Sequence, residues 1–264
     1  MAMGKIQEAL QKAEREYQQK LMPKTEDGFD TAMTTTRQAE PSWLVKGRHE
    51  PFFGPKGNGY KAQYDAIKSN LLSRYPAETL KTMVFTSTNY GEGTSTTALN
   101  VAAALAVDPW RSVLLIDADI RKPCLHEIFN VDLANGLSDF LSEDKIIEPQ
   151  SNKIGSNFYF FTSGLMGERA LGRFESDRFE KFLDAMKNRF DYVILDCPPV
   201  SKFPETRAIA RKAAGVVLVI NSGRTRQCVA MRAKKELTEA GANLLGVVLN
   251  RRQYHIPNWL YKRL

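Results

Sequence analysis

Residues 87–97 read STNYGEGTSTT and follow a short apolar run that predicts a strand. Gly91 and Gly93 let backbone N–H groups approach a phosphate closely, and a helix that begins here adds the positive potential of its N-terminus. Ser95 stands where such loops place the hydroxyl that binds Mg²⁺. The usual pattern is G-x-x-x-x-G-K-[ST], however, and this chain has Thr94 where the phosphate-binding lysine belongs. The loop by itself is therefore also compatible with a plain glycine-rich turn.

Two later segments place carboxylates where open parallel sheets bind their ligands. VLLIDADIRKP (113–123) is an apolar strand that ends in Asp117 and Asp119, and DYVILDCPP (191–199) is another that ends in Asp196. The carboxyl ends of parallel strands meet at one edge of the sheet, so we expect these acids beside the loop. Such carboxylates can hold Mg²⁺ through water and accept a proton. One acidic strand end is usually a helix cap, but the loop and two acidic strand ends together predict a nucleotide site.

The chain after Tyr60 alternates between helical and strand patterns. Continuous Val, Ile and Leu runs separated by helices predict an α/β fold, with a doubly wound, mostly parallel sheet and helices on both faces. The expected strands are 82–86, 112–117, 158–161, 192–196, 215–221 and 244–250. The expected helices are 61–74, 94–107, 176–189 and 225–240, with short helices near Leu125 and Leu137.

The first 59 residues differ from this domain in composition. Residues 1–22 are expected to form an amphipathic helix, because apolar residues recur at helical spacing: Ile6, Leu10, Ala13, Tyr17 and Leu21. The polar face of this helix has both signs of charge, which favours packing against a partner helix or itself over a membrane anchor. Residues 23–59 are rich in Pro, Gly and Thr and are expected to be a linker. The domain is assigned to residues 60–264.

Composition excludes several classes of protein. The chain has 264 residues, 43% of them apolar, and no apolar run approaches the roughly 18 residues needed to cross a bilayer. No secretory signal opens the chain, so a cytoplasmic protein is expected. Cys124, Cys197 and Cys228 are widely spaced and have no histidine at ligand spacing, which indicates neither a disulfide framework nor a zinc site.

Positive charge is concentrated toward the C-terminus. The net charge is +7, yet residues 201–264 hold 13 Lys or Arg against three Asp or Glu. Such a basic surface fits an anionic membrane leaflet, an acidic protein or nucleic acid, and it also fits a solvated face. The residues alone leave these alternatives open.

Three segments together resemble a known family: GEGTSTTALN, LLIDADIRKP and DYVILDCPPV. They are similar to the deviant-Walker P-loop ATPases and, among these, to the bacterial tyrosine kinase (BY-kinase) family of capsule and exopolysaccharide synthesis. The resemblance covers residues 60–252 and includes GLSDFL (136–141) and GVVLNRR (246–252). It implies a P-loop NTPase-type fold that binds ATP or ADP with Mg²⁺. It also implies a membrane chain-length (co-polymerase) or export protein as partner, a homo-oligomer, and a peripheral location at the inner face of the cell membrane.

The resemblance also implies roles for single residues. Mg²⁺ would be bound, directly or through water, by Ser95, Asp117 and Asp196. Asp117 would be the catalytic base near the acceptor tyrosine, and Asp119 would support it. The implied nucleotide-binding residues are Gly91, Glu92, Gly93, Thr94, Ser95, Thr96 and Asn250. Arg224 and Thr225 would lie near the base of the nucleotide. Tyr254 and Tyr261 are the candidates for autophosphorylation, with packing as the alternative role.

Several positions depart from the family pattern. Thr94 replaces the family's lysine, and Asn89 stands where the septum-positioning and partition relatives have a second lysine. The ring-forming segment of the family resembles E-x-x-R-x-x-R-x-N, whereas AQYDAIKSN (62–70) keeps only the final Asn and has Lys68 for the second arginine. We therefore expect weak nucleotide affinity, impaired phosphoryl transfer and few intersubunit ion pairs.

These observations favour a degenerate kinase-like regulator of polysaccharide synthesis. The first alternative is an active tyrosine autokinase in which Lys122, Arg121 or an arginine of a neighbouring subunit replaces the missing lysine. The second alternative is a partition-type ATPase on DNA, which Asn89 disfavours, so nucleic acid is not the expected partner.

Overall fold

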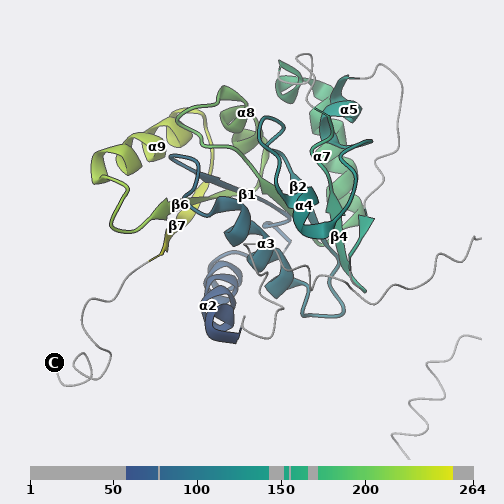
Figure 1. The fold of residues 1–264 in the computed structure, drawn as a ribbon, viewed down its shortest axis with the longest axis horizontal. Coiled ribbons are helices and arrows are strands. Elements are labelled where there is room, and N and C mark those ends of the chain that lie inside the picture. Colours follow the sequence, from purple (N-terminus) through teal and green to yellow (C-terminus); the bar gives the residue numbers. More distant parts are fainter. Residues whose placement is uncertain (1–57, 77, 143–151, 155, 166–171, 252–264) are drawn as a thin grey trace, which may run out of the picture. The chain divides into compact units, whose positions relative to one another are not determined.

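The structure is a computed structural model that describes residues 58–76, 78–142, 152–154, 156–165 and 172–251 (Figure 1). These residues belong to one compact unit, Pro41–Leu264. The predicted helix at 1–22, nearly all of the predicted linker, Tyr254 and Tyr261 lie outside the described residues. Within the described ranges, no helix is long and apolar enough to cross a membrane.

One sheet runs through the described part of the chain, with the strand order β3-β4-β2-β5-β1-β6-β7. Neighbouring strands are parallel, except that β3 at the edge is antiparallel to β4. The strands are Thr82–Ser87 (β1), Val113–Asp117 (β2), Asn152–Lys153 (β3), Phe158–Phe161 (β4), Tyr192–Asp196 (β5), Gly215–Asn221 (β6) and Leu244–Asn250 (β7). β1, β2 and β5 are buried along their whole length, as central strands covered on both faces must be. The doubly wound, mostly parallel α/β fold is confirmed.

Helices cover both faces of the sheet, with α2 and α3 on one side and α7, α8 and α9 on the other (Figure 1). Leu71 of α2 and Leu99 of α3 belong to one apolar cluster, whereas Phe182, Ile209 and Leu237 belong to the cluster on the opposite face. Both faces are apolar because successive strand residues point to opposite sides and both sides are buried. The helices are α2 (Asn58–Arg74), α3 (Thr94–Leu105), α4 (Leu125–Phe129), α5 (Leu137–Ser142), α7 (Asp177–Arg189), α8 (Pro204–Lys212) and α9 (Gln227–Glu239), with a 3-10 turn at Gly172–Glu175.

The sequence prediction contains no helix between β5 and β6, but α8 lies there. Its signals are Pro204 at the first helical positions and Glu205 in the first turn, which are typical of a helix start. Only a short apolar stretch, with Ala208 and Ile209 buried, follows them. The two-residue strand β3 is also absent from the prediction, because so short a segment shows no periodicity.

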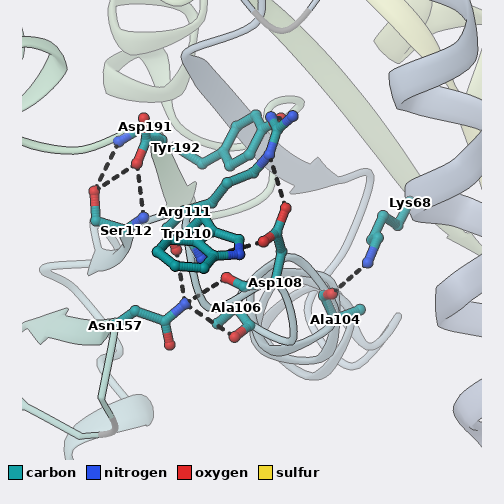
Figure 2. A network of polar contacts seen from close by, with 10 residues as sticks. All are labelled: Lys68, Ala104, Ala106, Asp108, Trp110, Arg111, Ser112, Asn157, Asp191 and Tyr192. Carbon is teal, nitrogen blue, oxygen red and sulfur yellow. Dashed lines mark hydrogen bonds and ion pairs between the residues drawn. The ribbon is translucent and has the colours of Figure 1, made fainter. Parts of the chain in front are cut away.

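Lys68 has an internal role in the folded domain. Its Nζ donates a hydrogen bond to the carbonyl oxygen of Ala104 at 2.8 Å, in the last turn of α3 (Figure 2). A cation at this place stabilises the negative end of the helix dipole. Lys68, which the resemblance implies at the place of a ring-forming arginine, therefore joins α2 to α3 of the same chain.

The loop between α3 and β2 is fastened by polar contacts, which Figure 2 shows from close by. The side-chain amide of Asn157 lies 3.0, 2.7 and 2.8 Å from the carbonyl oxygens of Ala106, Asp108 and Arg111. The carboxylate of Asp191 accepts hydrogen bonds from the N–H and the hydroxyl of Ser112. These contacts fix the start of β2, and with it the position of the acids at its other end.

Candidate functional site

The loop between β1 and α3 has a backbone that requires glycine at two positions. Gly91 and Gly93 have φ of 80° and 90°, which L-residues rarely adopt. A Cβ on Gly93 would lie 2.0 Å from Nδ2 of Asn250. No side chain caps the N-terminus of α3, so the first amides of this helix are left for a ligand or water.

The buried side chain of Glu92 holds this loop in shape. Its carboxylate accepts the backbone N–H of Thr88 at 2.7 Å and of Asn89 at 3.0 Å, as well as the Thr88 hydroxyl at 2.9 Å. Thr225, in the turn after β6, donates a hydrogen bond from its hydroxyl to the same carboxylate. The backbone oxygen of Glu92 accepts a hydrogen bond of 2.9 Å from Asn250. The side chain of Glu92 thus faces the loop itself. Hydrogen bonds from the turn after β6 and from the end of β7 hold Glu92 in this position.

The structure brings the predicted acids together beside this loop. Asp117 and Asp196 are the last residues of β2 and β5 and are direct partners in the register of these strands. Asp119 lies two residues further, and its backbone N–H donates to Asp117 at 3.2 Å. The exposed fractions of Asp117, Asp119 and Asp196 are only 0%, 7% and 2%. The carboxylates therefore face each other in a place where solvent screens little of their charge.

This burial changes the protonation of the acids. Burial, together with the charge of Asp119, raises the pKa of Asp117 to about 7, although backbone N–H groups of Leu125 and Cys124 oppose the shift. Burial and the charge of Asp117 raise the pKa of Asp196 well above its ordinary value. Burial likewise raises the pKa of Asp119. A cation between these groups would relieve this cost of burial.

Two features of the acid cluster fit such a cation. Oδ2 of Asp196 is buried and has no hydrogen-bond partner within the described residues, and a buried acceptor of this kind is costly to leave unpaired. The Ser95 side chain, in the first turn of α3, hydrogen-bonds to the same carboxylate. The described residues contain no group of three His, Cys, Asp or Glu side chains that could hold a metal by themselves, so a bound cation would need further ligands. Mg²⁺ suits this arrangement, because it keeps several waters and takes other ligands from phosphates.

Thr94 is nearly buried, with 9% of its surface exposed, and it brings no charge to the loop. The sequence prediction names Arg121 as one substitute cation. The structure pairs Arg121 with the buried carboxylate of Glu205 and places its guanidinium 4.9 Å from the centre of the Phe203 ring. Arg121 is therefore already neutralised by an acid of α8.

Two lysines approach the loop from other segments. Nζ of Lys122 lies 5.5 Å from the centre of the Tyr90 ring, and Nζ of Lys202 lies 5.9 Å from the same centre. The sequence prediction names Lys122 as a substitute cation and assigns no role to Lys202 or Tyr90. Tyr90 has no signal in the sequence beyond its place in the loop, and Lys202 arrives through the connection between β5 and α8.

A cavity of about 520 Å³ opens on the β6 and β7 side of the loop. Loop residues 89–92 line it together with residues 224–226 and Arg251. This volume is within the usual range for small-molecule sites, and its arginines favour an anionic ligand. Arg224 and Thr225, for which the resemblance implies a place near the base of a nucleotide, both line this cavity.

The fold and the site define a P-loop NTPase-type domain, with Thr94 where the usual loop pattern has lysine. A family model described as an AAA domain matches residues 80–231. Tyrosine-protein kinase CpsD of Streptococcus agalactiae is 30% identical over 194 residues, which cover 71% of this chain and 82% of that protein. Tyrosine-protein kinase YwqD of Bacillus subtilis is 32% identical over 192 residues, which cover 71% of this chain and 79% of that protein. The chain belongs to the bacterial tyrosine kinase (BY-kinase) family.

A solved structure agrees with this assignment. The crystal structure of the chimerical protein CapA2B2 superposes with a TM-score of 0.68 and 30% identity. The match covers 81% of this chain and 91% of the chimera. The predicted P-loop NTPase-type fold is thereby confirmed.

Proposed function

We propose that this protein is a BY-kinase-like regulator of exopolysaccharide or capsule synthesis that binds ATP or ADP with Mg²⁺ and transfers phosphate poorly. The observation that supports this most directly is Thr94, an uncharged and nearly buried residue where the family has lysine. Around it, the glycine conformations, the uncapped α3 and the acid cluster are all retained. Parts that bind a magnesium nucleotide are thus present, while the fixed cation is missing.

The chain's own residues suggest how the site would work. Loop residues 91–96 and the N-terminus of α3 would hold the phosphates, and Ser95 with Asp196 would hold Mg²⁺. When bound, Mg²⁺ supplies positive charge to the phosphate oxygens. Asp117 would accept the proton of the acceptor hydroxyl, for which a pKa of about 7 is well matched to neutral pH. Asp119 would orient Asp117 through its backbone N–H.

The missing lysine should affect transfer more than binding. A charge-assisted hydrogen bond contributes about 1.5 to 3 kcal/mol to binding, and amides and Mg²⁺ can replace part of it. Loss of one preorganised donor aimed at developing charge costs on the order of 10² to 10³ in rate. Phosphoryl transfer depends almost entirely on positioning and electrostatics, so weak or absent turnover is expected.

A second candidate function is an active ATP-dependent tyrosine autokinase. The observation in its favour is that Lys122 and Lys202 both lie near the Tyr90 ring of the loop. Either lysine could turn toward the phosphates when nucleotide binds. A partition-type function has no such support, because the loop-start position holds Asn89, whose side chain donates to the Thr88 hydroxyl at 3.2 Å.

The partner is proposed to be a membrane chain-length or export protein, which would keep this protein at the inner face of the membrane. The support is family membership together with the basic, exposed side of α9, where Arg232, Lys234 and Lys235 are exposed. Such a surface suits acidic protein segments or anionic lipid.

The decisive experiment compares the unaltered protein with Thr94→Lys. We expect little tyrosine phosphorylation in Mg-ATP from the unaltered protein, and about 10- to 100-fold tighter ATP binding in Thr94→Lys. Isothermal titration and anti-phosphotyrosine blots measure the two effects. Ser69→Lys, which adds the same charge to an exposed position of α2, is the matched control. Robust phosphorylation of the unaltered protein that Asp117→Asn abolishes would show that the autokinase alternative is correct.

A further inference from the structure

Tyr90 projects from the phosphate-binding loop toward the acid cluster. Its hydroxyl donates to Oδ1 of Asp119 at 3.4 Å, and the backbone N–H of Asp119 donates to Oδ1 of Asp117 at 3.2 Å. The residue is 37% exposed, so solvent still reaches part of it. A tyrosine hydroxyl therefore already contacts Asp119, the neighbour of the acid that the proposed function assigns to an acceptor tyrosine.

The ring of Tyr90 is held by side chains from two other segments. Its centre lies 5.6 Å from the centre of the Phe203 ring, with the planes tilted by 55°. Lys122 and Lys202 lie within 6 Å of the same ring, where a cation is attracted by the π-face. Contacts from the segment after β2 and from the start of α8 thus meet on one aromatic ring. Together they form a small site around the phenol ring of Tyr90.

At this place the Tyr90 hydroxyl is suited to donate a hydrogen bond and not to accept one. Burial and the negative charge of Asp119 raise the pKa of Tyr90 above its ordinary value. The hydroxyl therefore keeps its proton at neutral pH and donates a hydrogen bond to the carboxylate of Asp119. An acceptor tyrosine that approached the same acids would have to displace this hydrogen bond first.

We propose that Tyr90 is an internal pseudosubstrate, whose side chain occupies the place of the acceptor tyrosine between Asp119, Phe203 and the two lysines. The proposal rests on the proposed function, because it takes Asp117, with Asp119 beside it, as the acid that receives an acceptor hydroxyl. It adds a second obstacle to phosphoryl transfer that is independent of Thr94. An acceptor binds only to the fraction of molecules in which Tyr90 has left, so its apparent affinity falls by that fraction.

The test measures acceptor binding directly, because turnover is expected to be low. The probe is a fluorescently labelled Glu-Glu-Tyr-Glu-Glu peptide, whose acidic residues suit Lys122 and Lys202. The control is the same peptide with Phe in place of Tyr. Fluorescence anisotropy gives the Kd with and without Mg²⁺ and a non-hydrolysable ATP analogue. The variants are Tyr90→Ala, Tyr90→Phe and, as a control just after α2, Tyr75→Phe. Circular dichroism melts confirm that each variant is folded.

We expect Tyr90→Ala to bind the Tyr peptide at least about 10-fold more tightly than the unaltered protein. Tyr90→Phe, which keeps the ring but loses the hydrogen bond to Asp119, should show a smaller gain in the same direction. The Phe peptide should gain little, and Tyr75→Phe should change nothing. If Tyr90→Ala does not fold, the sign of the Tyr90→Phe effect decides.

Three outcomes would overturn the proposal: no gain in the Tyr90 variants, an equal gain for both peptides, or no peptide binding to any variant. Nucleotide affinity of the unaltered protein and of Thr94→Lys is measured separately. If neither binds nucleotide, the proposed function fails, while the peptide comparison in the absence of nucleotide still decides the role of Tyr90.

Discussion

Glu92 illustrates how one buried carboxylate can shape a phosphate-binding loop. It is 4% exposed and accepts hydrogen bonds from two backbone N–H groups and from two hydroxyls, those of Thr88 and Thr225. A carboxylate is an acceptor only, so each of these donors finds a partner without conflict. The sequence assigns Glu92 to nucleotide binding, and the contacts give it a supporting role in the loop.

We predict that Glu92→Gln lowers the free energy of unfolding by about 2 to 3 kcal/mol, because the new amide group would face donors and leave some unpaired. Urea unfolding followed by circular dichroism measures this change. Glu239→Gln, at an exposed position of α9, should change it by less than about 0.5 kcal/mol. Equal effects of the two substitutions would contradict the supporting role of Glu92.

At the level of secondary-structure elements, β2 and β5 set the electrostatics of the site. Their parallel register places Asp117 directly opposite Asp196, each at a strand end and each buried. Because the strand register keeps these two residues side by side, their repulsion destabilises the folded protein whenever both carboxylates are charged. Folding stability should therefore depend on pH in a direction opposite to that of a typical aspartate.

We predict that the metal-free protein loses stability as the pH rises from about 4 to about 7. The unfolded-state pKa of aspartate is about 3.9, whereas Asp117 in the folded protein has a pKa of about 7. In this window the folded state retains a proton that the unfolded state has released, so the free energy of unfolding falls by up to about 1.4 kcal/mol per pH unit from this group. Above pH 7 the effect of this group ends.

Urea unfolding across this pH range, with EDTA present, checks the prediction through the difference between the unaltered protein and Asp117→Asn. The difference should shrink at low pH and grow toward neutral pH, with Asp117→Asn the more stable form there. Asp132→Asn, at an exposed position, should follow the unaltered protein. A difference that does not change with pH would show that burial does not raise the pKa of Asp117.

On the scale of the complete domain, charge is divided unevenly. Acids gather inside the site at the carboxyl ends of β2 and β5, while exposed basic residues gather on α9 and in the turn before it, among them Arg224, Arg226, Arg232 and Lys234. Lys68, in contrast, is used inside the domain. The exposed cations are thus available to a partner, whereas the ammonium group of Lys68 is engaged within the domain.

We predict that the protein binds vesicles of anionic lipid in a salt-dependent way and that Arg232→Gln with Lys234→Gln weakens this binding by about 30-fold, at about 1 kcal/mol per cation. Vesicle flotation at several salt concentrations measures it. Lys61→Gln with Lys181→Gln removes the same charge from exposed positions of α2 and α7 and serves as the control. Equal loss in both double variants would mean that net charge, and not the α9 surface, attracts the protein.

Much of this protein can be inferred from local patterns along the chain. Apolar runs such as 192–196 and 215–221 predict strands that match β5 and β6, because burial on both faces demands continuous apolar residues. Strand-end acids and the glycine loop predict a shared site, because parallel strands bring their carboxyl ends to one edge. Family membership follows from the same segments.

Other features depend on contacts between residues far apart in the sequence. The hydrogen bonds from Tyr90 to Asp119, from Thr225 to Glu92 and from Lys68 to Ala104 leave no periodic pattern, since each depends on strand register and loop conformation. Burial, which raises the pKa of the site acids, likewise arises only when helices close over both faces of the sheet. Local residue patterns thus suffice for the elements and the edge at which ligands bind, whereas folding in three dimensions selects the side chains that meet there.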